Sequence, residues 1–195
     1  SIDARYERKL FLANLMHMTA SVFGQLSGYW WIADAVADPH IYKMVESVAM
    51  ESGCALQVVH PNLFVTQDLP AYVGQFIRRL SNTSLKDTVY RGGKDIERKL
   101  QRDERLVGPA LLYYDKFSEI PVQLCKTIAA ACISTPKDES DTMSDMDTAF
   151  LKAIEDEGVE SLFRTKLKVE NRNELIDFIS QEYRQLLHTV KTSGK

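Results

Sequence analysis

Three polar side chains that can exchange protons or donate hydrogen bonds lie in an otherwise apolar run near the start of this sequence. They are Lys9, Asn14 and His17. On an α-helix, Asn14 and His17 lie roughly 140° and 80° around the axis from Lys9. Asn14 and His17 are three residues apart and share a face. Lys9 and His17 are separated by about 12 Å of helix rise, much of which a lysine side chain can cover. An ammonium, a carboxamide and an imidazole would form a row along one side.

The same residues also fit an ordinary structural role. A lysine at the start of a helix usually extends its amine into water. A single histidine among apolar residues usually makes a structural hydrogen bond. The spacing alone therefore leaves both interpretations open.

A longer sequence pattern favours chemistry. The motif Lys-x4-Asn-x2-His follows Tyr6-Glu7-Arg8 and precedes Gly24-x3-Gly28. A second block contains LSN (80–82), LKDTVYR (85–91), RKL (98–100) and DERLVGPA (103–110). In residue type, order and interval, the two blocks resemble the substrate-binding domain of the polyol-specific long-chain dehydrogenases. The resemblance extends from about Arg5 to about Ile133.

This resemblance implies roles for five residues. Lys9 matches the family's catalytic lysine, a general acid/base that exchanges a proton with the reacting oxygen as hydride moves. Asn14 matches an amide that donates to this oxygen, where negative charge develops. His17 matches a contact to a substrate hydroxyl or carbonyl. Lys99 matches a substrate-binding lysine, and Arg91 would fit a polyol or phosphate contact.

The resemblance also implies the fold and the reaction. The expected fold is an all-α, multi-helix domain like the C-terminal domain of the 6-phosphogluconate dehydrogenase type. The expected reaction is the NAD-dependent interconversion of mannitol 1-phosphate and fructose 6-phosphate. Three departures keep a free sugar alcohol or a sugar acid open as substrate. Met16 stands where the family usually has a small glycine, Lys94 where arginine is common, and Ile96 where proline is common.

The cofactor is expected to bind mainly elsewhere. The sequence has no Gly-x-Gly-x-x-Gly after a strand and no strand–helix alternation. We therefore expect residues 1–195 to be one helical substrate-binding domain without the NAD-binding domain, either separated from it or naturally solitary. A different class of function also remains open. The chain could be a helical interaction or dimerisation domain that keeps the fold without the chemistry.

Composition excludes several function classes. Hydrophobic residues make up 45% and charged residues 26% of the 195 residues, as in soluble globular proteins. The net charge of −3 gives no overall attraction to nucleic acid or anionic membranes. No apolar run approaches the ~20 residues of a membrane span. The three cysteines lack a Cys-x2-Cys pair, which argues against a disulfide framework or a zinc site. We expect a cytoplasmic protein without a metal.

Charge is unevenly distributed along the chain. From Arg78 to Arg105 there are nine Lys/Arg residues against five Asp/Glu. This stretch is either a solvated surface or a cationic pocket for an anion, since arginine suits bidentate phosphate contact. It lacks the interleaved aromatic residues of a nucleic-acid surface. Residues 134–147 contain five acidic residues and one lysine, which predicts an exposed linker or loop.

Helical periodicity predicts the elements that position these residues. Asp38 before Pro39, and Asp68 before Leu69-Pro70, are expected N-caps. The adjacent glycines Gly92 and Gly93 predict a loop. Short helices are expected between residues 150 and 163. The longer predicted helices cover residues 5–29, 39–53, 68–80, 108–117, 121–131 and 174–190.

Overall fold

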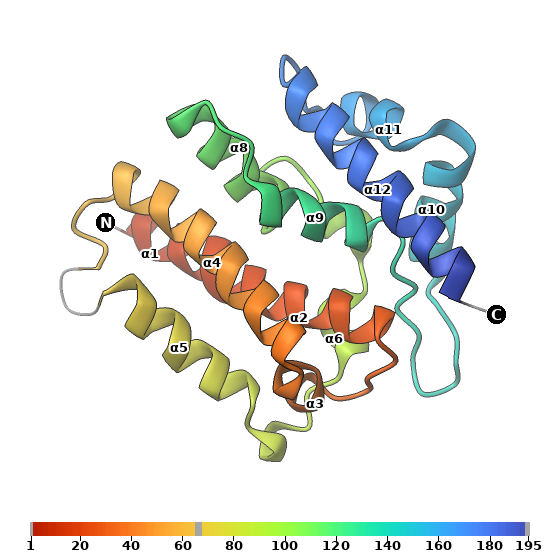
Figure 1. Cartoon of the computed structure of the whole chain (residues 1–195), viewed down its shortest axis with the longest axis horizontal. Helices are drawn as coiled ribbons and strands as arrows, with labels where there is room; N and C mark the ends of the chain where they lie inside the picture. Colours follow the sequence, from red (N-terminus) through yellow and green to blue (C-terminus); the bar gives the residue numbers. More distant parts are fainter. Residues whose placement is uncertain (1, 65–67, 194–195) are drawn as a thin grey trace.

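The computed structural model describes residues 2–64 and 68–193, and this part of the chain is helical (Figure 1). No β-strand occurs in these ranges, although an isolated antiparallel bridge joins Trp31 to Thr88. The predicted all-α class is confirmed. The elements of the first half are α1 (Ile2–Arg8), η1 (Lys9–Asn14), α2 (Leu15–Leu26), α3 (Ile32–Ala37), α4 (Pro39–Val59), α5 (Leu69–Leu80) and η2 (Thr83–Leu85). The second half contains α6 (Val89–Gly93), α7 (Ile96–Lys99), α8 (Val107–Phe117), α9 (Val122–Ala131), α10 (Asp145–Glu157), α11 (Val159–Thr165) and α12 (Asn173–Ser193).

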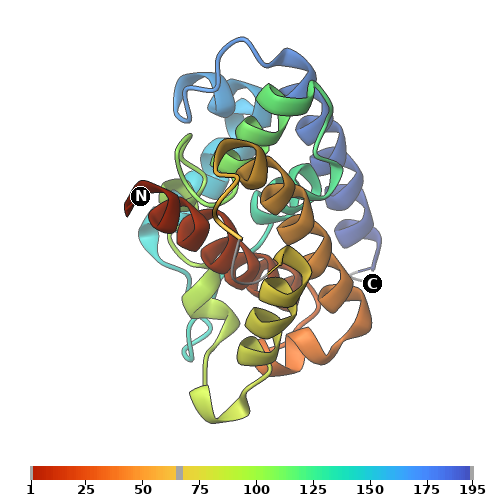
Figure 2. The same cartoon turned by 90° about the vertical axis from the view of Figure 1, so that its left-hand side faces the viewer.

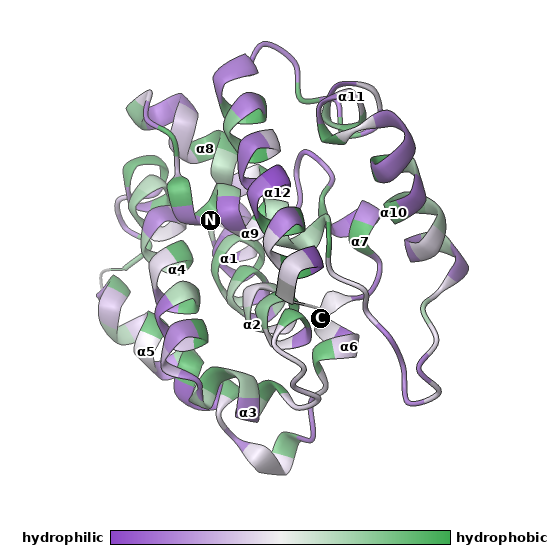
Figure 3. Cartoon of the chain, turned by 45° about the vertical axis from the view of Figure 1, so that its right-hand side comes forward, coloured by the Kyte–Doolittle hydropathy of each residue, from purple (hydrophilic) through white to green (hydrophobic). Residues whose placement is uncertain are grey.

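The helices pack around α2 and α4. Helix α4 contacts α2, α5, α8 and α9, and α12 contacts α9 and α11. Figure 1 shows α5 at one side of the molecule and α12 with α10 and α11 at the other, and Figure 2 views the molecule from the α5 side. The apolar faces point inward (Figure 3) and form two buried clusters. One of these clusters joins α2, α4 and α5.

The predicted N-caps are confirmed. The Asp38 carboxylate accepts hydrogen bonds from the backbone N–H groups of His40 and Ile41, with Pro39 opening α4. The Asp68 carboxylate accepts from the N–H of Ala71 at the start of α5. Helix α4 continues past the predicted end at Gly53 to Val59, because the apolar positions continue inward.

The glycine predictions need correction. Gly92 and Gly93 do not form a loop but lie in α6. A Cβ on Gly92 would collide with the Ser21 side chain, so the glycines serve the close approach of α6 to α2. Gly24 serves the same contact, since its Cβ would lie 2.8 Å from a methyl of Val89. Gly28 instead adopts φ +79° after α2, with nothing near its Cβ position.

The acidic segment is less exposed than its composition predicts. Most of residues 132–144 form a loop, but Asp147 in α10 is buried. Its carboxylate accepts from the N–H groups of Asp95 and Ile96 and thereby caps α7. Burial is tolerated because these hydrogen bonds replace water. Asp147 therefore ties α10 to the short helix that carries Lys99.

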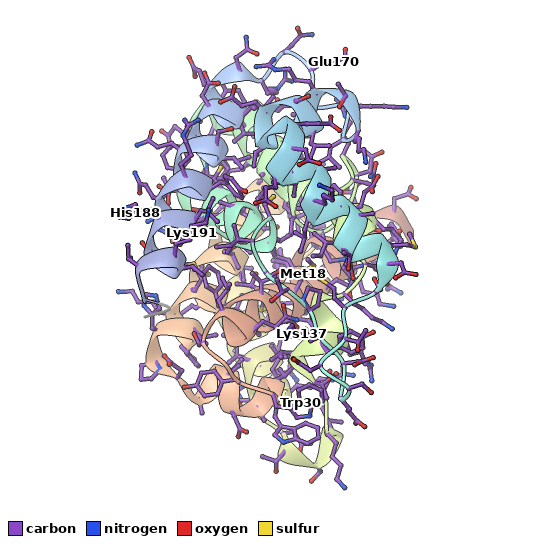
Figure 4. All side chains as sticks on the ribbon, turned by 90° about the vertical axis from the view of Figure 1, so that its right-hand side faces the viewer. Met18, Trp30, Lys137, Glu170, His188 and Lys191 are labelled. Carbon is purple, nitrogen blue, oxygen red and sulfur yellow. The ribbon has the colours of Figure 1, made fainter. Side chains whose placement is uncertain are left out.

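The outer side of α12 carries polar side chains. Figure 4 shows the side chains of His188 and Lys191 on the outer side of α12, while Met18 lies inside the molecule. Among the described residues, no helix combines the length and apolarity needed to cross a membrane.

Candidate active site

A pocket of about 800 Å³ opens between the N-terminal helices and α5. This volume lies in the range of about 300–1,000 Å³ that is typical of small-molecule sites. The first wall comes from η1 and α2 and is lined by Lys9, Ala13, Asn14 and His17. The predicted row of ammonium, amide and imidazole therefore faces one shared pocket.

The other walls come from α5 and from the segment before and within α6. Helix α5 contributes side chains at positions i, i+3, i+4 and i+7, which is one helical face. These are Tyr72, Gln75, Phe76 and Arg79. Asp87 and Arg91 line the third wall. Helix α5 packs mainly against α4. Its pocket-facing side therefore lies near η1 without packing against that turn.

Lys9 and Asn14 are brought together by a π-helical turn. Residues Lys9–Asn14 form a π-helix, in which hydrogen bonds join residues five apart. Lys9 and Asn14 are five apart, so one wide turn places both on the pocket side. The N–H of Leu15 bonds to Leu12, and the Phe11 carbonyl instead accepts a 2.6 Å hydrogen bond from the Ser52 hydroxyl. Ser52, buried on α4, thus satisfies a carbonyl within this irregular turn.

The turn before Lys9 is anchored by the chain that follows α4. His60 Nε2 lies 2.7 Å from a carboxylate oxygen of Glu7. The Arg8 guanidinium donates to the Leu63 carbonyl and lies over the ring of Tyr72, 5.2 Å from its centroid. These contacts hold α1 beside α5. His60 is the residue that directly follows the last turn of α4.

Neither the Lys9 ammonium nor the Asn14 side-chain amide bonds to another described residue. Lys9 is exposed and Asn14 is half-buried. Both groups are therefore available to a ligand, the first as a proton donor or acceptor and the second as a hydrogen-bond donor.

His17 is held by a carboxylate. Its Nε2 lies 2.8 Å from Oδ2 of Asp87, and Oδ1 of Asp87 lies 3.6 Å from Nε of Arg91. The hydrogen bond from His17 lowers the pKa of Asp87, so Asp87 is ionised at neutral pH and can only accept. The shared hydrogen must therefore sit on Nε2. This leaves Nδ1 as the second hydrogen-bonding nitrogen of the ring.

Lys99 lies outside the pocket lining. It is only 4% exposed and donates a 2.8 Å hydrogen bond from Nζ to the Gly92 carbonyl. Burial, followed by the charge of Arg105, lowers its pKa to about 8. Lys99 thus stabilises α6 through Gly92. Gly92 is the next residue after Arg91, whose side chain is exposed at the pocket.

The structure thus groups Lys9, Asn14, His17 and Arg91 but places Lys99 behind the third wall. Met16, which stands where the family usually has a small glycine, does not line the pocket, because it is fully buried in the core between α2 and α5. Asp87 was not predicted as a site residue. The only signal was its place inside the LKDTVYR block, since its partner His17 is 70 residues away in sequence.

The geometry suits proton transfer to a polyhydroxylated, oxygen-rich ligand. A lysine, an amide and an oriented imidazole can contact neighbouring oxygens on one substrate face. Within residues 2–64 and 68–193, no three His, Cys, Asp or Glu side chains cluster as metal ligands do.

Comparisons with known proteins identify the family of this chain. The family described as the mannitol dehydrogenase C-terminal domain matches residues 1–187. Mannitol-1-phosphate 5-dehydrogenase of Geobacillus thermodenitrificans is 32% identical over 180 residues, covering 92% of this chain and 45% of the relative. The enzyme of the same name from Emericella nidulans is 40% identical over 109 residues, covering 56% of this chain and 28% of the relative.

A solved structure has the same fold. It is the Pseudomonas fluorescens mannitol 2-dehydrogenase ternary complex with NAD and D-mannitol, with a TM-score of 0.72 and 19% identity. The alignment covers 98% of this chain and 40% of that structure. The chain thus spans less than half the length of these relatives. With a family match over nearly its whole length, the chain belongs to the mannitol dehydrogenase family and comprises its helical C-terminal domain.

Proposed function

We propose that this chain is the substrate-binding and catalytic half of an NAD-dependent polyol dehydrogenase that interconverts mannitol 1-phosphate and fructose 6-phosphate. The observation that carries the proposal is the shared pocket of Lys9, Asn14 and His17. The curated relatives named above are mannitol-1-phosphate 5-dehydrogenases. Residues 2–64 and 68–193 contain no strand–glycine loop–helix unit of the kind that binds dinucleotides. In this proposal, NAD is held mainly by a dinucleotide-binding domain joined to this one.

In this proposal, each group of the first wall has one task. The Lys9 ammonium gives a proton to the carbonyl oxygen of the sugar, or its amine takes one from the alcohol. The Asn14 amide donates to the same oxygen as negative charge develops. His17, held by Asp87, contacts a neighbouring hydroxyl. The cofactor accepts or supplies the hydride.

The exposure of Lys9 fits a second half that covers the pocket. General acid/base catalysis by a lysine requires burial or nearby positive charge, which brings its pKa toward neutrality. In this half Lys9 is exposed at the pocket. A bound substrate and a docked dinucleotide domain would exclude water from it.

The test is NADH-linked reduction of fructose 6-phosphate by the chain joined to a dinucleotide-binding domain of the family. Lys9→Ala should lower kcat by about 100-fold or more, as expected for loss of a general acid. Lys43→Ala, an exposed lysine on α4 outside the pocket, is the matched control and should leave kcat unchanged. A loss below about tenfold for Lys9→Ala would contradict its role.

The alternative function is a helical interaction or dimerisation domain that keeps the fold without the chemistry. Calorimetry of the chain with fructose 6-phosphate separates the two. No heat at millimolar ligand would favour an interaction or dimerisation domain.

A further inference from the structure

The charges around the pocket are unbalanced. Lys9, Arg79 and Arg91 line it from three different elements, and Asp87 is the one carboxylate among its described lining residues. Asp87 already faces His17 through Oδ2 and Arg91 through Oδ1. A pocket with surplus positive charge favours an anionic ligand.

Arg79, like Lys9, has no ion-pair partner among the described residues. It projects from the last turn of α5, and no described carboxylate lies within ion-pair distance of it. Its one-turn neighbours on the same face, Gln75 and Phe76, also line the pocket. Arg78, the adjacent arginine, lies elsewhere, because its guanidinium runs back along α5 beside Gly74. Of these two successive arginines, Arg79 lines the pocket and Arg78 does not.

A second arginine lines the same pocket. Arg91 lies on α6, on a different wall, and its side chain is 72% exposed. Guanidinium groups bind phosphate oxygens through paired N–H donors, and two of them can share one dianion. The first wall, with its amine, amide and imidazole, is left for the uncharged carbon chain.

We propose that Arg79 is a specificity-determining residue of this pocket and binds the phosphate group of the substrate opposite Arg91. This inference rests on the proposed function, which it deepens by assigning phosphate selectivity to one residue of α5. Arg79 lies outside the two sequence blocks that carry the family resemblance. Phosphorylated and free polyols are then distinguished by α5 rather than by the reacting row of Lys9, Asn14 and His17.

The test measures binding to the 195-residue chain by calorimetry with three probes: fructose 6-phosphate, fructose and inorganic phosphate. Arg79→Ala should weaken fructose 6-phosphate binding by about 10- to 100-fold, the usual effect of losing a charge-assisted contact. Fructose binding should change less than about threefold, and Arg79→Lys should keep part of the affinity because a point charge remains. Arg78→Ala, the matched control, should bind all probes like the wild type. Affinity for fructose 6-phosphate should also fall with added salt, less steeply in Arg79→Ala.

The outcomes separate the two proposals. If Arg79→Ala and Arg78→Ala have equal effects on fructose 6-phosphate, or if fructose loses as much affinity, the role of Arg79 is overturned while the polyol site stands. A third outcome is that inorganic phosphate binds through Arg79, fructose does not bind, and fructose 6-phosphate binds no more tightly than inorganic phosphate. In that case the anion site stands and the proposed function fails. If neither fructose 6-phosphate nor inorganic phosphate binds, the assignment of Arg79 is overturned. D-Gluconate binding as tightly as fructose 6-phosphate through Arg79 would replace phosphate by carboxylate and also overturn it.

Discussion

Removing the Ser52 hydroxyl tests whether the π-helical turn is held in place from α4. Ser52 is fully buried and donates a 2.6 Å hydrogen bond to the Phe11 carbonyl, whose α-helical donor, the N–H of Leu15, bonds to Leu12 instead. Ser52→Ala removes this hydrogen bond from a carbonyl that has lost its α-helical donor. The cost of an unpaired buried acceptor is about 1–3 kcal/mol. For a chain of 195 residues, this corresponds to a fall in Tm of about 3–9 °C.

The same variant also disturbs the site. If η1 relaxes to an α-helix, Lys9 and Asn14 separate by roughly 140° around the axis instead of sharing one wide turn. Affinity for fructose 6-phosphate should then fall together with Tm, measured by calorimetry and thermal melting of the chain. Ser47→Ala, on the same helix and without a hydrogen bond to η1, is the control for the substitution itself. The reasoning is refuted if Ser52→Ala melts within about 1 °C of wild type and binds the ligand equally well.

Two further predictions concern charged groups around α6. The hydrogen bond from His17 lowers the pKa of Asp87 below its ordinary 3.8, so its stabilising contribution is full above about pH 4 and is lost as pH falls through the lowered pKa. Asp87→Asn should therefore lower Tm at pH 6, by more than Asp156→Asn at an exposed ion pair, with the difference shrinking toward pH 3. Burial lowers the pKa of Lys99 to about 8 from 10.5, so unfolding takes up a proton between these values and wild-type stability should gain a rising component from pH 8 to 10.5. Lys99→Met should remove that rise in pH-dependent denaturant titrations; an unchanged rise would contradict the assignment.

Local signals carried much of the fold. The Asp38-Pro39 and Asp68-Leu69-Pro70 starts were predictable because a cap needs only its own side chain and the next turn. The shared pocket of Lys9, Asn14 and His17 followed from the family pattern rather than from the helical angles. Those angles assumed 100° per residue throughout, and the π turn makes that assumption wrong at Lys9.

Features that depend on distant partners were not predictable. Adjacent glycines predict a loop when read locally, but Gly92 is fixed by the side chain of Ser21 on another helix. Asp147 reads as part of a solvated acidic run, yet two backbone N–H groups of α7 make its burial favourable. Asp87 gains its role from contact with His17. In each case the deciding group lies far away in sequence.

The π turn connects these observations to the site. A π turn has poorer intrinsic stability than an α-helix and persists where surrounding contacts compensate for it. Here the compensation is visible as Ser52 on the Phe11 carbonyl and as the anchoring of Glu7 by His60. The irregular turn places the side chains of Lys9 and Asn14 in the lining of the same pocket. Leu12, in the same turn, remains fully buried in the core. A regular α-helix of the same sequence would place Lys9 and Asn14 roughly 140° apart around its axis, whichever face it turned to the core. The irregularity is therefore best explained by the site that it forms.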